Sequence, residues 1–221
     1  MTERPILFSA PMVRAILDGR KTQTRRVVKP QPTGTSDRPR DRVHYGIPDG
    51  YEHDGETFYA WQASGWSAKS PYGSPGDRMW ARETWAVDAP LDEVRRECED
   101  VMGPSGWGHG PYFRADLVHE NSGLTWRPSI FMPRWASRIT LEVVNVRVER
   151  VQEISEHDAV AEGLSNDEKT KLLWLPCAEK GKAHISPVLA YRDLWNSINT
   201  KRGHGWDTKP WVWVIEFKRC I

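Results

Sequence analysis

The strongest alternation of apolar and polar positions lies near the C-terminus, in the segment PWVWVIEFK. Successive side chains of a β-strand point to opposite faces, so this period of two predicts a strand. One face carries Trp211, Trp213, Ile215 and Phe217, and the other carries Val212, Val214, Glu216 and Lys218. The segment SRITLEVVNVRVERV has the same period but changes phase between Val143 and Val144. This change of phase predicts a strand with a β-bulge, or a strand that bends to change neighbours.

Two segments further upstream also predict strands. Residues 22–28 favour extended structure, which is expected to run up to Lys29 because the residue before a proline is biased away from the helix. In GDRMWARETWAV the positions alternate so that Glu83 shares one face with Met79 and Ala81. One face of this predicted strand therefore carries a carboxylate.

Capping signals predict three helices. Ser9 and Gly19 bracket a short helix near the N-terminus. Ser155 begins the capping-box sequence SEHD, and that helix is expected to end at Gly163. A third helix is predicted to begin at Ser186. The residues spaced for its buried face are Val188, Tyr191, Leu194, Trp195 and Ile198.

Two long stretches between these elements, residues 31–75 and 88–133, are rich in Pro, Gly and Ser and show no sustained period. They are interpreted as loop insertions in a single domain that spans residues 1–221, with a short aromatic strand near Tyr59–Trp61 inside the first insertion. Strands separated by irregular segments and short helices predict a mostly β fold with peripheral helices (α+β). A small, mostly antiparallel barrel is the expected architecture.

Composition restricts the class of protein. The chain has 221 residues, of which 38% are hydrophobic and 12 are Trp, and this is sufficient for one packed core. No apolar run approaches the roughly 18 residues of a membrane span and no signal-peptide pattern opens the chain, so we expect no membrane partner and a cytoplasmic location. Cys98, Cys177 and Cys220 lie far apart and form no CxxC pair. We therefore predict no disulfide framework, no metal and no cofactor.

Charge is uneven along the chain although the net charge is only +1. Residues 20–42 contain eight Lys and Arg against two Asp, a local charge of +6 that leaves −5 for the remainder. Such a segment attracts phosphate when its cations are free, or forms ion pairs with carboxylates such as those between Asp88 and Asp100. The sequence leaves both interpretations open.

The segment ILDGRKTQTRR places Lys21 and Thr24 at the expected turn between the first helix and the strand that follows. A threonine hydroxyl becomes a nucleophile when a neighbouring base takes its proton, and a lysine can be that base when burial or nearby cations lower its pKa. The nearby cations are Arg20, Arg25 and Arg26. Strict alternation would put Lys21 and Thr24 on opposite faces of a strand, so their meeting requires an irregular turn.

Four segments, AILDGRKTQTRR, GDRMW, SEHDAVAEGL and WVWVIEFK, resemble the ASCH family in content and order, and the N-terminal motif is similar to that of its phage and prophage members. The resemblance implies a PUA-like β-barrel with a cleft for a nucleobase or nucleotide. The small bacterial members that it resembles are N4-acetylcytidine amidohydrolases with a Thr, Lys and Glu triad. The resemblance places these three roles on Thr24, Lys21 and Glu162.

In the implied mechanism Lys21 deprotonates Thr24, whose alkoxide attacks the acetyl carbonyl, and water then clears the acyl-threonine. Glu162 orients Lys21 or passes a proton to the leaving amine. The end of a helix disfavours a carboxylate by about 0.3–1 kcal/mol, so the position of Glu162 fits either a functional role or ordinary solvation. Glu83 is the alternative carboxylate, either partly buried in a cleft or paired with a neighbouring arginine.

A second hypothesis is a binding module that holds RNA or single-stranded DNA without turnover, and a nuclease is a third. Arg25 directly follows the proposed nucleophile and, with Arg20 and Arg26, is a candidate for binding phosphate. Trp80 and Trp85 flank the proposed insertions and are candidates for stacking on a base, although most tryptophans are expected in the core. The expected partner is therefore a modified nucleoside or nucleotide, with RNA or single-stranded DNA as the alternative.

Overall fold

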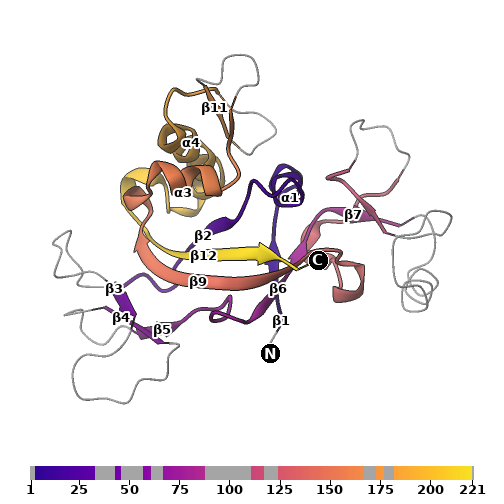
Figure 1. Cartoon of the computed structure of the whole chain (residues 1–221), viewed down its shortest axis with the longest axis horizontal. Coiled ribbons are helices and arrows are strands. Elements are labelled where there is room, and N and C mark those ends of the chain that lie inside the picture. The colour runs from indigo at the N-terminus through magenta and orange to yellow at the C-terminus, as the bar shows by residue number, and fades with distance from the viewer. Residues whose placement is uncertain are drawn as a thin grey trace.

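The computed structural model (Figure 1) describes residues 3–32, 43–45, 57–60, 67–87, 111–116, 124–166, 173–176 and 182–220. Its largest unit is a five-stranded sheet with the strand order β1-β6-β9-β12-β2. These strands are β1 (Glu3–Leu7), β2 (Gln23–Val27), β6 (Arg78–Arg82), β9 (Thr140–Arg150) and β12 (Trp211–Arg219). β1 and β6 are parallel, and the other neighbouring pairs are antiparallel.

Smaller sheets and short helices complete the described part of the chain. The smaller sheets contain β3 (Val43–Tyr45), β4 (Thr57–Ala60) and β5 (Ser67–Lys69); β7 (Trp85–Ala86) and β8 (Tyr112–Phe113); and β10 (Ser165–Asn166) and β11 (Trp174–Leu175). The α-helices are α1 (Ala10–Leu17), α3 (Glu156–Ala161) and α4 (Pro187–Asn199). The 3-10 helices span Ser129–Phe131, Arg134–Ala136, Val151–Glu153, Thr200–Arg202 and Trp206–Thr208. The fold is therefore mixed α+β, with helices at the periphery of a β core.

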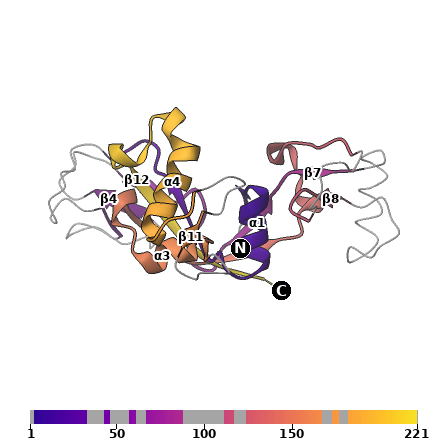
Figure 2. The ribbon, with the colours of Figure 1, turned by 90° about the horizontal axis from the view of Figure 1, so that it is seen from above.

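The five-stranded sheet is open. Among the described residues no ladder joins β1 to β2, so these two edge strands do not close the sheet into a barrel. In Figure 1, β9 curves beneath β12, while α3 and α4 lie together on the side of β2 and α1 lies apart from them. Figure 2 shows the same separation from above. Because α1 follows β1 and α3 contacts β2, the helices flank the two opposite edges of the sheet.

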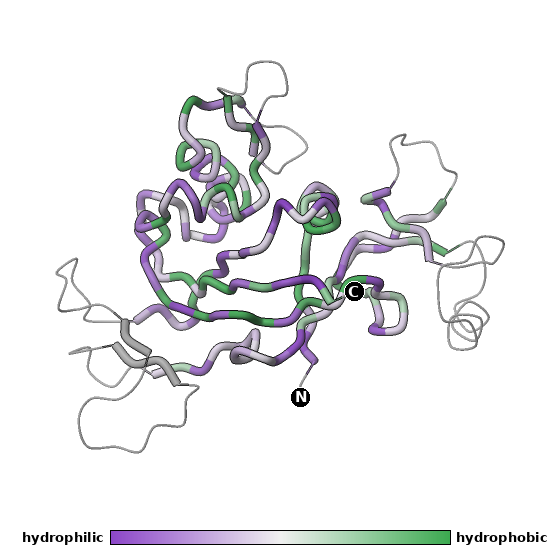
Figure 3. The backbone as a smooth tube through the Cα atoms, in the orientation of Figure 1, coloured by the Kyte–Doolittle hydropathy of each residue, from purple (hydrophilic) through white to green (hydrophobic). Residues whose placement is uncertain are grey.

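The core lies on both sides of β12. Every side chain from Trp211 to Ile215 is buried, because this strand sits between β9 and β2 and is covered on both faces. Helix α1 contributes Met12, Val13 and Ile16 to the same core, and Figure 3 shows the hydrophobic residues along α1 and β9. This packing holds β2 in place, with Thr24 opposite Ile215 in the ladder.

The predicted strands in the second half of the chain are confirmed, including the bulge. In the ladder between β9 and β12, Glu216 pairs with Asn145 whereas Phe217 pairs with Val143, so Val144 is the extra residue. Val144 is 49% exposed, as expected for a residue that leaves the pleat. The three predicted helices are confirmed as α1, α3 and α4.

Three expectations differ from the structure. The strand predicted over GDRMWARETWAV is divided, because β6 ends at Arg82 in its ladder with β1 and the chain then changes partner to pair β7 with β8. Ile198, expected on the buried face of α4, is 39% exposed because it lies in the last turn of that helix. The edge strand β1 was not predicted, because Pro5 interrupts the β pattern.

The two proposed insertions contain regular structure where they are described. Residues 31–75 include β3, β4 and β5, and β4 corresponds to the predicted aromatic strand up to Ala60. Residues 88–133 include β8 and a 3-10 helix. The remainder of both ranges, with the carboxylates between Asp88 and Asp100, lies outside the described residues, as do Cys98 and Cys177. No helix in the described part of the chain has the length and apolar character needed to cross a bilayer.

Candidate functional site

The turn between α1 and β2 brings Lys21 to the end of α3. Gly19 adopts a positive φ of 73°, and the Lys21 amide then donates to the carbonyl of Ala15 at 2.9 Å. Lys21 forms a single antiparallel bridge with Glu162 before the regular strand begins at Gln23. The irregular turn that would allow Lys21 to approach this region is therefore present. Lys21 precedes β2, so the alternation of side chains along that strand does not fix its direction.

The Lys21 ammonium and the Glu162 carboxylate form a buried ion pair. The Nζ atom of Lys21 donates to Oε2 of Glu162 at 2.7 Å, and the two side chains are 0% and 4% exposed. Nζ also donates to the backbone carbonyls of Gln23 and Glu162, each at 2.8 Å. Three acceptors match the three protons of an ammonium, so this arrangement holds Lys21 in its charged form at rest.

Gly163 permits the close approach of these two elements. Its φ is 97°, and a Cβ atom built on it would lie 2.9 Å from the Cβ of Ala15 and 3.0 Å from the Cβ of Lys21. Real Cβ atoms do not approach other carbons so closely, and a positive φ disfavours any residue with a side chain. The glycine that ends α3 therefore also sets the contact between α1 and Lys21.

The second oxygen of Glu162 meets Arg25, which is the centre of a larger ion network. Nη1 of Arg25 lies 3.3 Å from Oε1 of Glu162, and Nη2 lies 2.5 Å from Glu149 and 3.0 Å from Asp158. Burial disfavours its charge, but Tyr191, Glu162 and Glu149 outweigh burial and raise the pKa of Arg25 above its ordinary value. Arg25 is a structural cation, and the phosphate-binding role expected for it does not fit these surroundings.

Arg147 joins the same network from β9. It contacts Asp158 at 2.8 Å and Glu149 at 3.2 Å, and it also pairs with Glu216. Burial raises the pKa of the Asp158 carboxyl, but Arg25 and Arg147 exceed this effect, and the pKa is lowered overall. Carboxylates from β9, α3 and β12 thus neutralise the cations that hold Glu162 in position.

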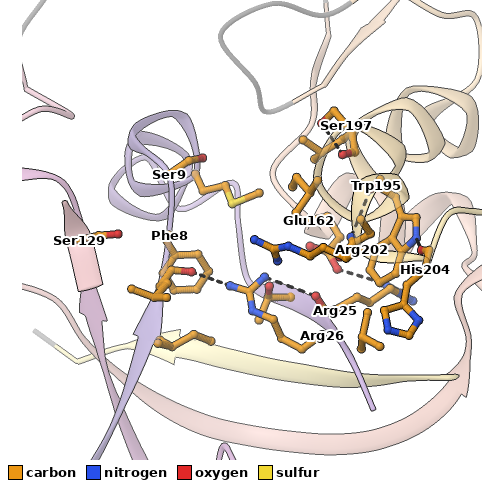
Figure 4. Close-up of a pocket in the computed structure, with 18 of the residues that line it drawn as sticks. Phe8, Ser9, Arg25, Arg26, Ser129, Glu162, Trp195, Ser197, Arg202 and His204 are labelled. Atoms are coloured by element: carbon orange, nitrogen blue, oxygen red, sulfur yellow. Dashed lines mark hydrogen bonds and ion pairs between the residues drawn. The ribbon is translucent and has the colours of Figure 1, made fainter. Parts of the chain in front are cut away.

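A cavity of about 920 Å³ opens beside this pair. Its walls come from β1 and the start of α1 on one side and from β2 and α4 on the other, across the gap between the two edges of the sheet (Figure 4). Thr24 and Glu162 both line it, whereas Lys21 is not among the lining residues and lies behind Glu162. Thr24 and Glu162 therefore line the same cavity, and Lys21 contacts Glu162 from behind that lining.

The remaining candidate residues from the sequence occupy different places. Arg26 lines the cavity and donates through Nη2 to the carbonyl of Leu7 at 2.7 Å. Arg20 lies outside the lining, where it pairs with Asp18 at 2.8 Å and donates to the Gly163 carbonyl at 2.9 Å. Arg20 therefore supports the turn and does not face the cavity.

Neither tryptophan that was a stacking candidate is placed to stack on a base. Trp80 is 6% exposed, and the guanidinium groups of Arg82 and Arg134 lie over its ring at 4.7 and 5.9 Å. Trp85 is 1% exposed and packs edge-on against Trp135. These rings are already covered by protein, so the expectation that they bind a base does not fit the structure.

The alternative carboxylate, Glu83, lies away from the cavity. It is 1% exposed and accepts from Nε and Nη2 of Arg138 at 3.0 and 3.2 Å. Burial raises the pKa of Glu83, and the hydrogen bonds and charge of Arg138 only partly offset this. Glu83 is absent from the lining of the cavity. Of its two interpretations, the ion pair with an arginine is therefore the one that fits the structure.

Sequence reasoning missed several residues that line the cavity. Tyr191 was assigned to the core, and it is buried, but its ring also lies under the Arg25 guanidinium at 5.8 Å. Ser9 stands at the N-terminal cap of α1 without a capping bond from its side chain. Lys29 belongs to the basic segment of residues 20–42, whereas Arg202 carried no motif, and only the folding of distant segments brings the two to the same cavity.

Comparison of the chain with family models, curated proteins and solved structures found no match. In the described part of the chain, no group of three or more His, Cys, Asp and Glu is arranged to hold a metal ion. The sequence motif and the geometry of this cavity are therefore the features that bear on function.

Proposed function

We propose that this chain is an ASCH protein whose five-stranded sheet corresponds to the strands of a PUA-like fold, although the described strands form no closed barrel, and that it hydrolyses the N4-acyl amide of a modified cytidine. The observation that carries the proposal is the buried contact of 2.7 Å between Lys21 and Glu162, beside a cavity that Thr24 and Glu162 line together. A cavity of about 920 Å³ is within the usual range for small-molecule sites. The resemblance in motif order and this juxtaposition support the same three residues.

The ion pair supplies the proton transfers of the first half-reaction. A proton passes from the Lys21 ammonium to Glu162 along their hydrogen bond, which leaves a neutral amine and a carboxylic acid. The amine takes the hydroxyl proton of Thr24 as its oxygen forms a bond to the acyl carbon. Glu162 gives its proton to N4 as the C–N bond breaks, so the cytidine amine leaves and Lys21 and Glu162 are charged again.

Water completes the cycle through the same groups. Glu162 accepts a proton from the water that attacks the acyl-threonine, and Lys21 returns a proton to the Thr24 oxygen as that ester bond breaks. The proton on Glu162 then passes to Lys21, which restores the ion pair and releases the carboxylic acid. Every proton in this scheme moves between Thr24, Lys21, Glu162, the substrate and the attacking water.

The alternative is a module that binds RNA or single-stranded DNA without turnover. One observation favours it: in the described part of the chain no carboxylate pairs with Arg26, Lys29 or Arg202, all of which line the cavity. Uncompensated cations attract phosphate, and binding of this kind weakens steeply as salt increases. Hydrolysis of an uncharged nucleoside does not have this salt dependence.

The test is the release of acetate from N4-acetylcytidine by the purified chain and by variants of Thr24. Thr24→Val keeps the shape of the side chain but removes the hydroxyl, and we expect turnover to fall by at least about 10³-fold. Thr24→Ser keeps the hydroxyl and is expected to retain measurable turnover. Acetylation of Thr24 in a rapid quench with substrate, detected by mass spectrometry, would identify the covalent intermediate.

The matched control is Thr22→Val, two residues away at an exposed position, which is expected to hydrolyse the substrate at the rate of the unmodified chain. Circular dichroism confirms that each variant is folded. If the folded, unmodified chain releases no acetate, the amidohydrolase proposal is wrong for this substrate. Equal activity of Thr24→Val and the unmodified chain would exclude Thr24 as the nucleophile.

A further inference from the structure

The charges that line the cavity are unbalanced. Among the described residues Glu162 is the one carboxylate in the lining, and it is already neutralised by Lys21 and Arg25. Arg26, Lys29 and Arg202 line the same cavity, and in the described part of the chain none of them has a carboxylate within ion-pair distance. The wall that carries the proposed reaction is therefore close to neutral, while the three remaining charged residues of the described lining are cations.

Arg26 is held in place without loss of its charge. Its contacts are made to backbone carbonyls, to Leu7 at 2.7 Å and Arg25 at 3.4 Å, and its guanidinium lies 5.3 Å from the centre of the Phe8 ring. Carbonyl groups and an aromatic face orient a guanidinium but do not neutralise it, and further N–H groups remain for an anion. In Figure 4 the side chains of Arg26 and Arg202 enter the same space from β2 and from the segment that follows α4.

The start of α1 adds positive potential at the same place. Phe8, Ser9 and Met12 line the cavity, so the N-terminus of this helix faces it. The first turn contains no acidic residue, and the Ser9 side chain makes no capping hydrogen bond. Neither the first turn nor the cap residue therefore supplies an acidic group to the positive end of the helix dipole, and such an end favours a negatively charged ligand.

We infer that the cationic part of this cavity binds a phosphate, and that the substrate is a free acylated nucleotide and not the neutral nucleoside. This inference rests on the proposed function, because the base must lie at the wall of Thr24 and Glu162 while the phosphate lies toward Arg26 and Arg202. The cavity of about 920 Å³ accommodates a single nucleotide, which is why a free nucleotide is favoured over a strand.

The first experiment measures binding without turnover. Calorimetry compares cytidine 5′-monophosphate with cytidine at low salt and at about 0.5 M KCl. We expect the monophosphate to bind about tenfold or more tightly, and the advantage to shrink at high salt. Equal affinities for the two ligands would overturn the inference, whatever the chain hydrolyses. A short oligocytidine RNA that binds more tightly than the monophosphate would overturn the assignment to a free nucleotide.

The second experiment compares hydrolysis of N4-acetylcytidine and of its 5′-monophosphate, as the ratio of their kcat/KM values. Arg202→Gln, at an exposed position, is expected to reduce this ratio about tenfold, and Arg26→Gln is expected to do the same if it folds. Lys201→Gln removes a neighbouring exposed cation that does not line the cavity, and its ratio should equal that of the unmodified chain. An unchanged ratio in folded Arg202→Gln and Arg26→Gln would overturn the inference.

The two experiments separate the two proposals. Preferential binding of the monophosphate without hydrolysis of either acetylated compound would support the phosphate site and disprove the amidohydrolase. Hydrolysis of both compounds with the same kcat/KM would support the amidohydrolase and disprove the phosphate site.

Discussion

Glu162 and Glu83 are both buried carboxylates paired with a cation, yet their surroundings differ. Glu162 meets Lys21, which is fully buried, and its other oxygen meets Arg25 at the wall of a cavity. Glu83 meets Arg138, whose side chain is 24% exposed and also pairs with Asp116 at 2.7 Å. Burial and pairing alone therefore do not identify a functional carboxylate. What distinguishes Glu162 is a partner that can exchange a proton, next to a space for a ligand.

The chemistry of the two cations reinforces this difference. A lysine changes its protonation state when its environment shifts, whereas an arginine remains charged in proteins. The Lys21–Glu162 pair can therefore pass a proton within itself, and the Glu83–Arg138 pair cannot. The second pair instead fixes the chain where β6 ends and β7 begins.

The largest expected effect is a difference in turnover between substitutions of Glu162 and of Glu83. Glu162→Gln removes the group that accepts and donates protons, so turnover of N4-acetylcytidine should fall by about 10²–10⁴-fold. Glu83→Gln is the matched control, with the same change at an equally buried carboxylate, and its turnover should remain within about threefold of the unmodified chain. A loss in Glu83→Gln as large as that in Glu162→Gln would mean that the two carboxylates cannot be distinguished by their access to the cavity.

A second effect concerns the contact that brings Lys21 to Glu162. Gly163→Ala adds a Cβ within 3.0 Å of Ala15 and Lys21, and we expect a loss of about 2–4 kcal/mol in the free energy of unfolding. Gly203→Ala is the control, because Gly203 also has a positive φ but no atom within 4 Å of the added Cβ. Its free energy of unfolding should fall by about 1 kcal/mol, which is the cost of a positive φ for a residue with a side chain. Urea unfolding measures both, and equal losses would contradict a steric role for Gly163.

The smallest effect is a difference in pH dependence, again between the two regions. Arg25 and Arg147 lower the pKa of Asp158, so its stabilising contribution is complete above the ordinary pKa of about 3.9 and is lost as pH falls through the lowered value. Burial raises the pKa of Glu83, so its contribution is complete below the ordinary pKa of about 4.3 and is lost as pH rises through the raised value.

Urea unfolding from about pH 3 to about pH 7 tests this difference. The stability of the unmodified chain relative to Asp158→Asn should increase as pH rises, and its stability relative to Glu83→Gln should decrease. Two slopes of the same sign would contradict the opposite pKa shifts. Asn and Gln keep the size of each side chain, so the comparison isolates the ionisation of the carboxyl group.

The sequence predicted four of the five strands of the main sheet and the three α-helices, but few of the contacts that make the site. Periodicity located β9, its bulge and β12, because these depend on neighbours along one strand. The meeting of Lys21 and Glu162 joins positions 141 residues apart, and it was expected only from the resemblance to a family. The partners of Arg25 come from β9 and α3, and no local pattern indicates that three carboxylates would surround it. Pairing of this kind depends on the tertiary fold.

Arg26 connects the two edges of the open sheet, because it lies in β2 and donates to the carbonyl of Leu7 in β1. This hydrogen bond links the two strands where no backbone ladder joins them. Because Arg26 also lines the cavity, a substitution at this position alters the lining and removes a link between the two edges, while the backbone ladders of the sheet do not depend on its side chain. The lining of the cavity can therefore vary in sequence independently of the strand pairing that supports it.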